Sequence, residues 1–249
     1  MDEIIQRIYD RGTVIGRSGK THKLRACIDP REAEFLWSII RGDASIARTL
    51  EVGCAYGLSS LAICSALQGR EGASHTIIDP FENTDWDGAG TLNLETAGLR
   101  FFELIETKSE LALPELLYSF EGRFDLILID GWHTFDHKLL DCFYATRLLR
   151  VGGYLAIDDV YFPAVRRAVD FLSNYPCYEV CGSVSYEIKR SWKKALIRGL
   201  MSPVQRETWS AMLSRQLHQR IFDDQYSTML ALRKGTEDRR NWDWHEDRF

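Results

Sequence analysis

The chain has 249 residues, with 45% hydrophobic and 27% charged residues and a net charge of −5. That length and composition suit one α/β domain with a sizeable core, and the negative charge disfavours a nucleic-acid-binding protein, which needs a basic face. The six cysteines form no Cys-x-x-Cys pair, so neither a disulfide framework nor a zinc site is expected. The first ten residues lack a signal-peptide stretch and no apolar run is long enough to span a membrane, so we expect a cytoplasmic protein without membrane attachment.

Apolar runs alternate with segments of helical period along the chain. A helix capped by Asp29, with Pro30 in its first turn, precedes the first run. Helices are also predicted from residue 59 to Gly69 and from residue 137 to Gly152-Gly153. Strands are predicted at residues 47–52, 75–79, 101–106, 124–130 and 153–159, and two closing antiparallel strands at 177–188 and 226–235. The pattern predicts an α/β fold with a mostly parallel, seven-stranded sheet, helices on both faces, and ligands at the carboxyl ends of the strands.

The first strand runs into a glycine-containing turn, LEVGCAYGLSS, at residues 50–60. Gly53 and Gly57 would let the backbone approach a ligand closely. The dinucleotide-binding pattern Gly-x-Gly-x-x-Gly, begun at Gly53, would need a glycine at position 55. This chain has Ala55 there, so an NAD-dependent oxidoreductase is disfavoured. Glu51 is a poor neighbour for a pyrophosphate and a good one for a cationic amino group.

Polar residues follow the later strands. Asp79 ends the second strand, where an acid can hold both ribose hydroxyls of an adenosine, although it could also cap a helix. Ser109 and Glu110 follow the third strand and would equally suit a helix start. The fourth and fifth strands end in the clusters Asp130, Trp132, His133 and Asp158, Asp159. Trp132 could pack in the core or on an adenine, and the paired acids could cap the next helix, although Pro163 favours a cap near residue 162.

Taken in order, these features resemble class I S-adenosylmethionine (SAM)-dependent methyltransferases over about residues 28–188. The resemblance is greatest to the metal-dependent small-molecule O-methyltransferases of the catechol and caffeoyl-coenzyme A type, and to bacterial relatives acting on sugars and antibiotics. It implies a Rossmann-like class I methyltransferase fold. It also implies SAM contacts from Glu51, Gly53, Ala55, Gly57, Ser59, Asp79, Ser109, Glu110, Asp130 and Trp132.

The same resemblance implies a metal site. Catechol-type enzymes hold a divalent cation with an Asp after the fourth strand and an Asp-Asn pair after the fifth. The matching residues here are Asp130, Asp158 and Asp159, with Mg²⁺ the expected ion; the pair departs from the family as Asp-Asp. His133 replaces the family's general-base lysine, and histidine suits proton abstraction near neutral pH. A zinc site made by His133 and His137 is disfavoured, because no HExxH glutamate accompanies them.

The chain divides into four segments. Residues 1–47 form an N-terminal helical segment whose basic stretch 14–22 is predicted to be flexible and could close over the site as a lid. Residues 48–188 form the SAM-binding core, in which the long stretch 80–98 could line the cofactor mouth or the substrate pocket. Residues 189–225 form a basic helical insert between the last two strands, and residues 226–249 hold the last strand and the tail. The insert could be a lid over an anionic acceptor, a dimer contact or a helix packed on the sheet edge.

The expected activity is SAM-dependent methyl transfer to a hydroxyl of a small molecule of the sugar or natural-product type. A divalent cation would lower the pKa of that hydroxyl, and His133 would take its proton. The expected partners are a small-molecule acceptor, anionic if the basic insert contacts it, and a second copy of the chain in a homodimer. Two alternatives stay open: a metal-independent N- or O-methyltransferase that uses His133 alone, and a non-catalytic protein that binds SAM or a nucleotide.

Overall fold

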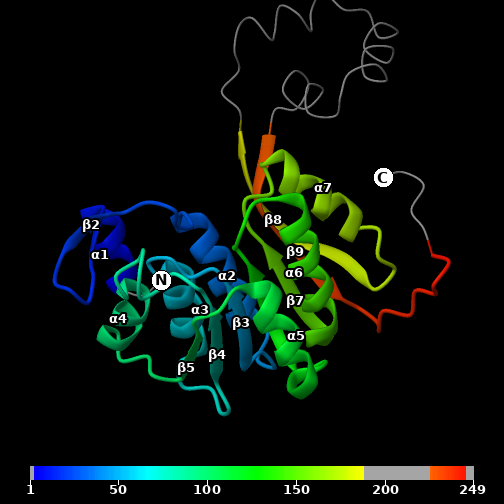
Figure 1. The fold of residues 1–249 in the computed structure, drawn as a ribbon, viewed down its shortest axis with the longest axis horizontal. Helices are drawn as coiled ribbons and strands as arrows, with labels where there is room; N and C mark the ends of the chain where they lie inside the picture. The colour runs from blue at the N-terminus through cyan, green and yellow to red at the C-terminus, as the bar shows by residue number, and fades with distance from the viewer. Residues whose placement is uncertain (1–2, 188–224, 245–249) are drawn as a thin grey trace, which may run out of the picture.

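A computed structural model describes residues 3–187 and 225–244 (Figure 1). Seven strands form one sheet in the order β5-β4-β3-β6-β7-β9-β8, and two short strands form a separate hairpin, β1-β2. Strand β9 runs antiparallel to both of its neighbours, while the pairs from β5 to β7 are parallel. The elements are α1 (Glu3–Arg11), β1 (Thr13–Ile15), β2 (Thr21–Lys23), α2 (Pro30–Gly42), β3 (Arg48–Val52), α3 (Leu58–Leu67), β4 (Ser74–Ile78), α4 (Ala89–Thr96), β5 (Phe102–Ile105), α5 (Ser109–Phe120), β6 (Phe124–Ile129), α6 (Phe135–Leu148), β7 (Leu149–Ile157), α7 (Pro163–Leu172), β8 (Tyr178–Glu187) and β9 (Gln225–Lys234).

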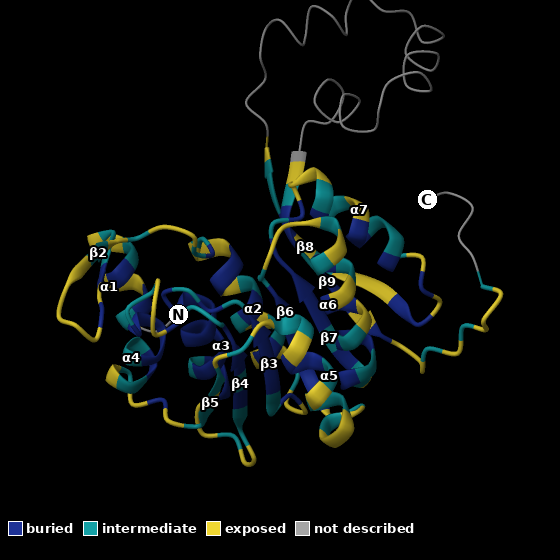
Figure 2. Ribbon diagram, in the orientation of Figure 1, coloured by how far each residue is buried: buried dark blue, intermediate teal, exposed yellow. Residues whose placement is uncertain are grey.

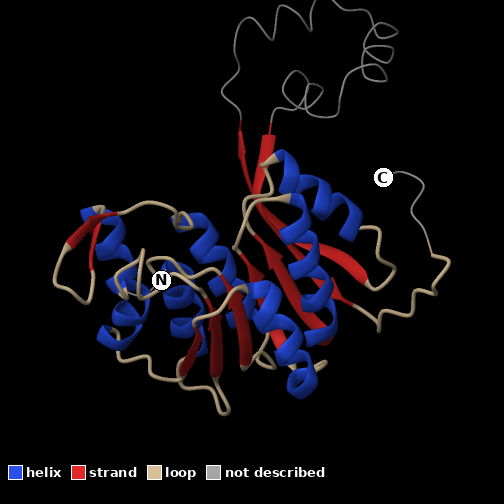
Figure 3. Ribbon diagram, in the orientation of Figure 1, coloured by secondary structure: helices blue, strands red, loops and turns tan. Residues whose placement is uncertain are grey.

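The predicted fold class is confirmed, with helices on both faces of a mostly parallel sheet (Figure 3). Helices α1 to α4 contribute to one apolar core and α5 to α7 to the other. The central strand β6 is buried along its whole length (Figure 2). Its side chains alternate between the two cores, Leu126 and Leu128 in the first and Ile127 and Ile129 in the second, as the period of two in a strand requires. The same alternation decides which side chains of the neighbouring strands can reach a given face.

The strand order reverses between β3 and β6. Strands β4 and β5 extend the sheet from one side of β3, and β6 and β7 extend it from the other. In open α/β sheets the crevice at such a switch point, outside the carboxyl ends of the strands, is where ligands bind. No described helix is long and apolar enough to cross a membrane.

The boundary between α6 and β7 differs from the prediction. Helix α6 ends at Leu148 and β7 begins at once at Leu149, so Gly152 and Gly153 lie inside the strand. Leu149 pairs with Phe124, and after an irregularity in the register Tyr154 pairs with Leu126. Gly152, at φ 85°, supplies the backbone conformation that this bulge needs. The glycine pair therefore interrupts a strand and does not terminate the helix.

Helix α2 begins as predicted. The Asp29 side chain accepts hydrogen bonds from the backbone N–H groups of Arg31 (2.7 Å) and Glu32 (3.1 Å), and the Glu32 carboxylate accepts from the Asp29 N–H at 2.7 Å. Pro30 takes the first helical position, where its missing N–H costs nothing. Tyr186 of β8 donates its hydroxyl proton to the Asp29 carboxylate. This last contact fixes the start of α2 beside the far edge of the sheet.

Residues 14–22, predicted to be flexible, form the β1-β2 hairpin and its turn. Asp87, in the loop before α4, accepts hydrogen bonds from the backbone N–H and hydroxyl of Ser18 and lies 3.0 Å from His22 Nε2. Arg17 donates to Glu95 of α4 at 2.7 Å. The hairpin is thus tied to α4, and the prediction of a flexible stretch is wrong. The predicted insert, apart from Gln225, lies outside the described residues, and so does the end of the tail from residue 245.

Candidate active site

A cavity of about 1240 Å³ opens at the carboxyl ends of the parallel strands. Single-ligand pockets usually measure about 300–1,000 Å³, so this one has room for a cofactor and a second molecule. We call the part of the cavity over β3, β4 and β5 its turn side, because the turn after β3 borders it; Gly53, Asp79 and Ser109 line this part. We call the part over β6, β7, β9 and β8 its β7 side, and residues at the start of α2 also line it.

The glycine turn after β3 comes very close to the residue that ends β6. Gly53 has φ 88°, and a Cβ built on it would lie 2.5 Å from the Asp130 backbone oxygen. Ala55 also has a left-handed backbone, with φ 49°, where a glycine would be less strained. Asp79 holds the turn, because its Oδ2 accepts the N–H groups of Cys54 (2.9 Å) and Ala55 (3.0 Å) while its Oδ1 accepts that of Phe81 (2.8 Å).

Glu51, Gly57 and Ser59 are buried but do not line the cavity. Because side chains alternate along β3, Glu51 faces α3, where it accepts a hydrogen bond from Ser60 and lies 3.1 Å from His75 Nε2. The expectation that Glu51 borders a cationic group of the cofactor is therefore corrected: its carboxylate is buried against Ser60 and His75, away from the residues that line the cavity. Gly57 and Ser59 were also expected to contact the cofactor, and this expectation is corrected too. Both lie at the start of α3, and Gly57 packs against the backbone of Gly90.

The other predicted cofactor contacts do line the cavity: Gly53, Ala55, Asp79, Ser109, Glu110, Asp130 and Trp132. Trp132 is 55% exposed and stacks on His137 at a ring distance of 5.2 Å, so it is a wall of the cavity and not a core residue. Trp86, from the long stretch after β4, also lines the cavity. The sequence analysis missed a further set of lining residues, which come from segments without a local motif: Ala26, Cys27, Tyr161, Phe162, Tyr186, Tyr226 and Thr228.

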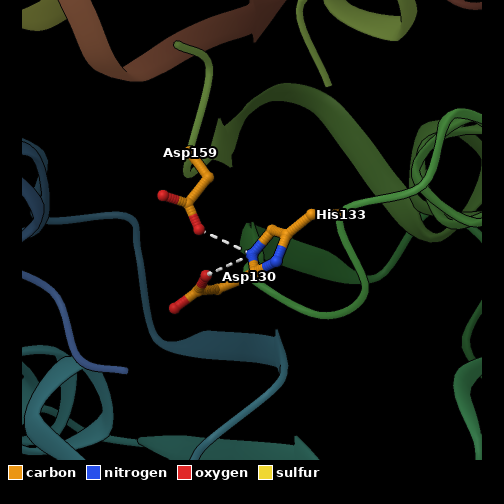
Figure 4. A group of neighbouring side chains, drawn as sticks. All are labelled: Asp130, His133 and Asp159. Carbon is orange, nitrogen blue, oxygen red and sulfur yellow. Dashed lines mark ion pairs between the residues drawn. The ribbon is translucent and has the colours of Figure 1, made fainter. Parts of the chain in front are cut away.

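Asp130, His133 and Asp159 all line the cavity, and their side chains point toward one another as an acid–histidine cluster (Figure 4). His133 Nε2 lies 2.6 Å from Asp159 Oδ2 and 4.0 Å from Asp130 Oδ1. One ligand atom from each residue falls within 4.8 Å of the other two. Asp159 has φ 59°, a conformation that Asp and Asn adopt more readily than other non-glycine residues. Of the three acids and the histidine that were expected to converge, these three residues bring their ligand atoms together, and their roles in catalysis and metal binding stay predictions.

Charge within this cluster is balanced by His133. The neighbouring carboxylates of Asp130 and Asp159 raise the pKa of His133 to about 9, above its usual range. The imidazole is therefore protonated at neutral pH in this arrangement and supplies a positive charge between the two acids. Burial raises the pKa of Asp130, although the hydrogen bond to His133 and the charge of Lys138 oppose that rise.

Asp158 lies next to this cluster but outside it. It is 5% exposed, lines the cavity, and its Oδ1 has no hydrogen-bond partner among the described residues. Burial, reinforced by the negative charges of Asp130 and Glu32, raises the pKa of Asp158 to about 10. Its role as a metal ligand stays a prediction, since the atoms that converge within coordinating distance belong to Asp130, His133 and Asp159.

Glu82, in the loop between β4 and α4, is a buried acid that should make stability depend on pH. Its Oε1 accepts hydrogen bonds from the Thr91 N–H (2.8 Å) and hydroxyl (3.1 Å), and burial raises its pKa to about 7. The folded state then binds the Glu82 proton more tightly than the unfolded state does. This contribution to stability is complete below about pH 4.5, the ordinary pKa of a glutamate side chain in water, and is lost as the pH rises through 7.

Glu82→Gln keeps the acceptor oxygen for Thr91 and removes the titration. Its free energy of unfolding, measured by urea titration, should rise relative to the wild type between pH 5 and pH 8 by on the order of 2 kcal/mol. Asp85→Asn, an exposed change in the same loop, serves as the control. A difference between Glu82→Gln and wild type that stays constant over this pH range would contradict the assignment.

The strand order, the glycine turn and the strand-end acids together define a class I methyltransferase fold. Residues 50–160 match the sequence model of the family described as Methyltransferase domain (Methyltransf_24). That segment begins in β3 and ends just after Asp159, so it contains the glycine turn and the whole acid–histidine cluster. This part of the chain is therefore similar to methyltransferase domains, in agreement with the class I methyltransferase fold of the sheet. A search of curated proteins found no match.

Solved structures share this fold at low sequence identity. An O-methyltransferase from Bacillus cereus, in complex with S-adenosylhomocysteine (SAH), has a TM-score of 0.63 and 14% identity over 94% of this chain and 92% of its own. The O-methyltransferase TomG from Streptomyces achromogenes, involved in tomaymycin synthesis and in complex with SAM, has a TM-score of 0.61 and 17% identity over 94% and 91%. The SAH-bound methyltransferase PaMTH1 from Podospora anserina gives 0.60 and 16% over 94% and 88%.

Proposed function

We propose that this protein is a methyltransferase that transfers the methyl group of SAM to a hydroxyl of a small molecule. The observation that carries the proposal is the position of the acid–histidine cluster. Gly53 of the turn lies against the backbone of Asp130, while Asp159 ends β7 on the other side of the cavity. A methyl donor seated over the turn and an acceptor seated over β7 would therefore meet beside His133, the proton acceptor that an alcohol requires.

The turn side of the cavity fits SAM. Gly53 leaves the backbone open to close approach, Asp79 lies at the end of β4 as a partner for ribose hydroxyls, and Trp132 with Ser109 and Glu110 would border the adenine. Bound there, the cofactor supplies a methyl group already activated by a sulfonium. The protein's task is then to align the two molecules and exclude water, which the apolar walls Ile78, Phe81 and Trp86 favour.

The acid–histidine cluster also fits a divalent cation. Two carboxylates and an imidazole nitrogen converge, and carboxylate oxygen is the ligand that Mg²⁺ and Mn²⁺ prefer. Asp130 and Asp159 would hold the ion, with Asp158 as the further predicted ligand. When bound, the cation would lower the pKa of the acceptor hydroxyl. His133, once neutral, would donate its Nε2–H to Asp159, which orients the ring, and would accept the hydroxyl proton at its other nitrogen, Nδ1.

A metal-independent reaction is the second candidate, because one feature favours it. His133 Nε2 lies between the Asp130 and Asp159 carboxylates in the arrangement described, so its own charge already offsets theirs. In that mechanism His133 and Asp159 would act as a base and its orienting acid, and the acceptor could be a hydroxyl or an amine. Chelation separates the two candidates.

The cofactor assignment is tested by calorimetry. SAH should bind with a dissociation constant in the micromolar range, equivalent to about 8 kcal/mol. Asp79→Asn, which removes the charge and replaces one of the two oxygens that accept backbone N–H groups, should weaken binding by at least roughly 1.5–3 kcal/mol, the range for a hydrogen bond to a charged group. Asp85→Asn, in the exposed part of the following loop, should bind SAH like the wild type. A measurable heat of binding for NAD, with none for SAH, would contradict the proposal.

A further inference from the structure

Three polar side chains from distant parts of the chain form a polar notch in the β7 side of the cavity. Glu32 comes from the first turn of α2, Asp158 follows β7, and Thr228 lies in β9. They are only 5%, 5% and 8% exposed, and all three line the cavity. None of them belongs to the acid–histidine cluster.

The polar notch has more hydrogen-bond acceptors than donors. Asp158 Oδ1 is buried and has no hydrogen-bond partner among the residues that the structure describes. Glu32 accepts a hydrogen bond from the Asp29 N–H, and the Thr228 hydroxyl, the one donor of the notch, hydrogen-bonds to the same carboxylate and lowers the pKa of Glu32 against the rise that burial causes. Buried polar atoms are almost always paired, so an unpaired acceptor in a residue that lines a cavity indicates a donor that enters from the cavity.

The charge of the cavity defines what kind of donor fits. The described lining contains the acids Asp29, Glu32, Asp79, Glu110, Asp130, Asp158 and Asp159. Lys108, at the end of β5, is the one lysine in that lining, and it lies on the turn side, far along the sheet from β9. An anionic group in the polar notch would face the like charges of Glu32 and Asp158. Of the described cations on this side, His133 is already paired with Asp159, and Arg31 lies over the ring of Tyr186. The expectation of an anionic acceptor came from residues 189–194, which lie outside the described chain.

Aromatic side chains surround the polar notch. Tyr186 and Tyr226 stack at a ring distance of 5.9 Å, and Tyr161 lies 6.0 Å from Tyr226 and 4.4 Å from Phe162. All four line the cavity. Carboxylates combined with aromatic faces are the surroundings that bind organic cations, because the ring faces attract positive charge and the acids pair with it.

We propose that Glu32, Asp158 and Thr228 bind an ammonium group of the methyl acceptor, so that the substrate is a hydroxyl compound that also carries an amine. An ammonium offers three N–H donors for the two acids and the hydroxyl of the polar notch. Its positive charge favours the ionised form of Asp158, whose pKa burial and the neighbouring acids raise to about 10 when no cation is present. The inference rests on the proposed function only in placing the acceptor on the β7 side. It assigns Asp158 to the acceptor, whereas the family resemblance assigns it to a metal.

The test measures binding of three matched probes to SAH-loaded protein by calorimetry. These probes are 4-hydroxybenzylamine, 4-hydroxybenzyl alcohol and 4-hydroxybenzoate, which share the phenol and differ in the charge of the side group. We expect the amine to bind at least about 10-fold more tightly than either of the others, the lower end of the range for a hydrogen bond to a charged group. Equal binding of the three, or no binding of the amine, would overturn the proposal.

Two variants locate the preference. Glu32→Gln keeps an acceptor for the Asp29 N–H, because glutamine also completes a capping box, and removes the charge. Thr228→Val removes only the hydroxyl. Both should lose most of the preference for the amine and bind the alcohol as before. Ser227→Ala, the adjacent change in β9, should keep the wild-type preference. A preference that survives in Glu32→Gln would place the ammonium elsewhere.

Two further measurements separate other occupants. SAH affinity should be unchanged in Glu32→Gln and Thr228→Val; a loss of more than about 10-fold would mean that the polar notch holds the cofactor's own ammonium and would overturn the proposal. Asp158→Asn should weaken binding of the amine while Mn²⁺ affinity, followed by electron paramagnetic resonance, stays the same. If Asp158→Asn instead lost Mn²⁺ affinity and bound the amine as before, Asp158 would be a metal ligand and the proposal would be overturned. Failure of SAH to bind at all would instead remove the proposed function.

Discussion

Replacing His133 with alanine should lower kcat by about 10²–10⁴-fold, the usual contribution of a general base. The imidazole is the one titratable nitrogen placed between Asp130 and Asp159, so its loss leaves no group in the acid–histidine cluster to take the acceptor proton. Turnover is followed as SAH release, with the hydroxyl compound that the wild type methylates fastest. SAH affinity should change little, since His133 lies on the acceptor side of the cluster.

His137→Ala is the matched control for this variant. His137 also lines the cavity, but its ring stacks on Trp132 and its Nδ1 lies 2.8 Å from the Thr134 hydroxyl, away from the acid–histidine cluster. We expect its kcat to stay within about threefold of the wild type, far less than the loss of a general base. Wild-type kcat in His133→Ala would contradict the assignment of the base, whichever mechanism applies to the metal.

Chelation with excess EDTA distinguishes the two candidate mechanisms in the same assay. If Asp130 and Asp159 hold a cation, EDTA should abolish turnover, Mg²⁺ or Mn²⁺ should restore it, and SAH binding should persist. Asp130→Asn should then behave like the chelated enzyme, because an amide oxygen is a weaker ligand than a carboxylate for a hard cation. An unchanged kcat in EDTA would contradict the metal-dependent mechanism and support the one that uses His133 and Asp159 alone.

Gly53→Ala should abolish detectable SAH binding, a loss of at least about 100-fold or roughly 2.7 kcal/mol. The added Cβ would lie 2.5 Å from the Asp130 backbone oxygen, and alanine is strained at φ 88°. Because both obstacles are backbone features, no side chain can move aside to relieve them. The turn would have to shift away from β6, and the surface that faces the cofactor would shift with it.

Ala55→Gly is the reverse substitution two residues later. Ala55 already has a positive φ of 49°, so glycine should relieve strain there and stabilise the fold by up to about 1 kcal/mol. SAH affinity should be kept, because the Ala55 N–H that Asp79 accepts is still present. Calorimetry and thermal unfolding of the two variants test the pair together. If the Gly53→Ala protein folded and bound SAH like the wild type, the turn would be able to accommodate a Cβ at position 53, and the prediction would be wrong.

The positions of the strands were predictable from the sequence, and so were the polar residues that end them. Apolar runs bounded by glycine or aspartate define β3, β4, β6 and β7, and parallel strands bring their carboxyl ends to one edge of the sheet. Asp79, Asp130 and Asp159 therefore had to meet there, and the structure places all three in the cavity.

Side-chain direction was harder to predict than position. Glu51 precedes the glycine turn in sequence but faces α3, because the period of two along β3 sends it to the opposite side from Leu50 and Val52. The pair Gly152-Gly153 resembles a helix stop, yet it forms a bulge inside β7, because pairing with β6 begins before it. In both cases the local sequence is compatible with two structures, and only the packing or pairing of the strand with its neighbours decides which of them forms.

By itself the sequence determined the fold class, the glycine turn and the acids at the strand ends, because these depend on patterns within a few residues. The tertiary structure alone decided which of those groups act together. Asp158 and Asp159 are adjacent in sequence, but the left-handed backbone of Asp159 places its carboxylate on His133 while Asp158 joins Glu32 and Thr228. The sequence analysis did not single out Glu32, which lies in the first turn of a predicted helix. Its position in the cavity depends on how α2 packs against β8, a long-range arrangement that leaves no local signal.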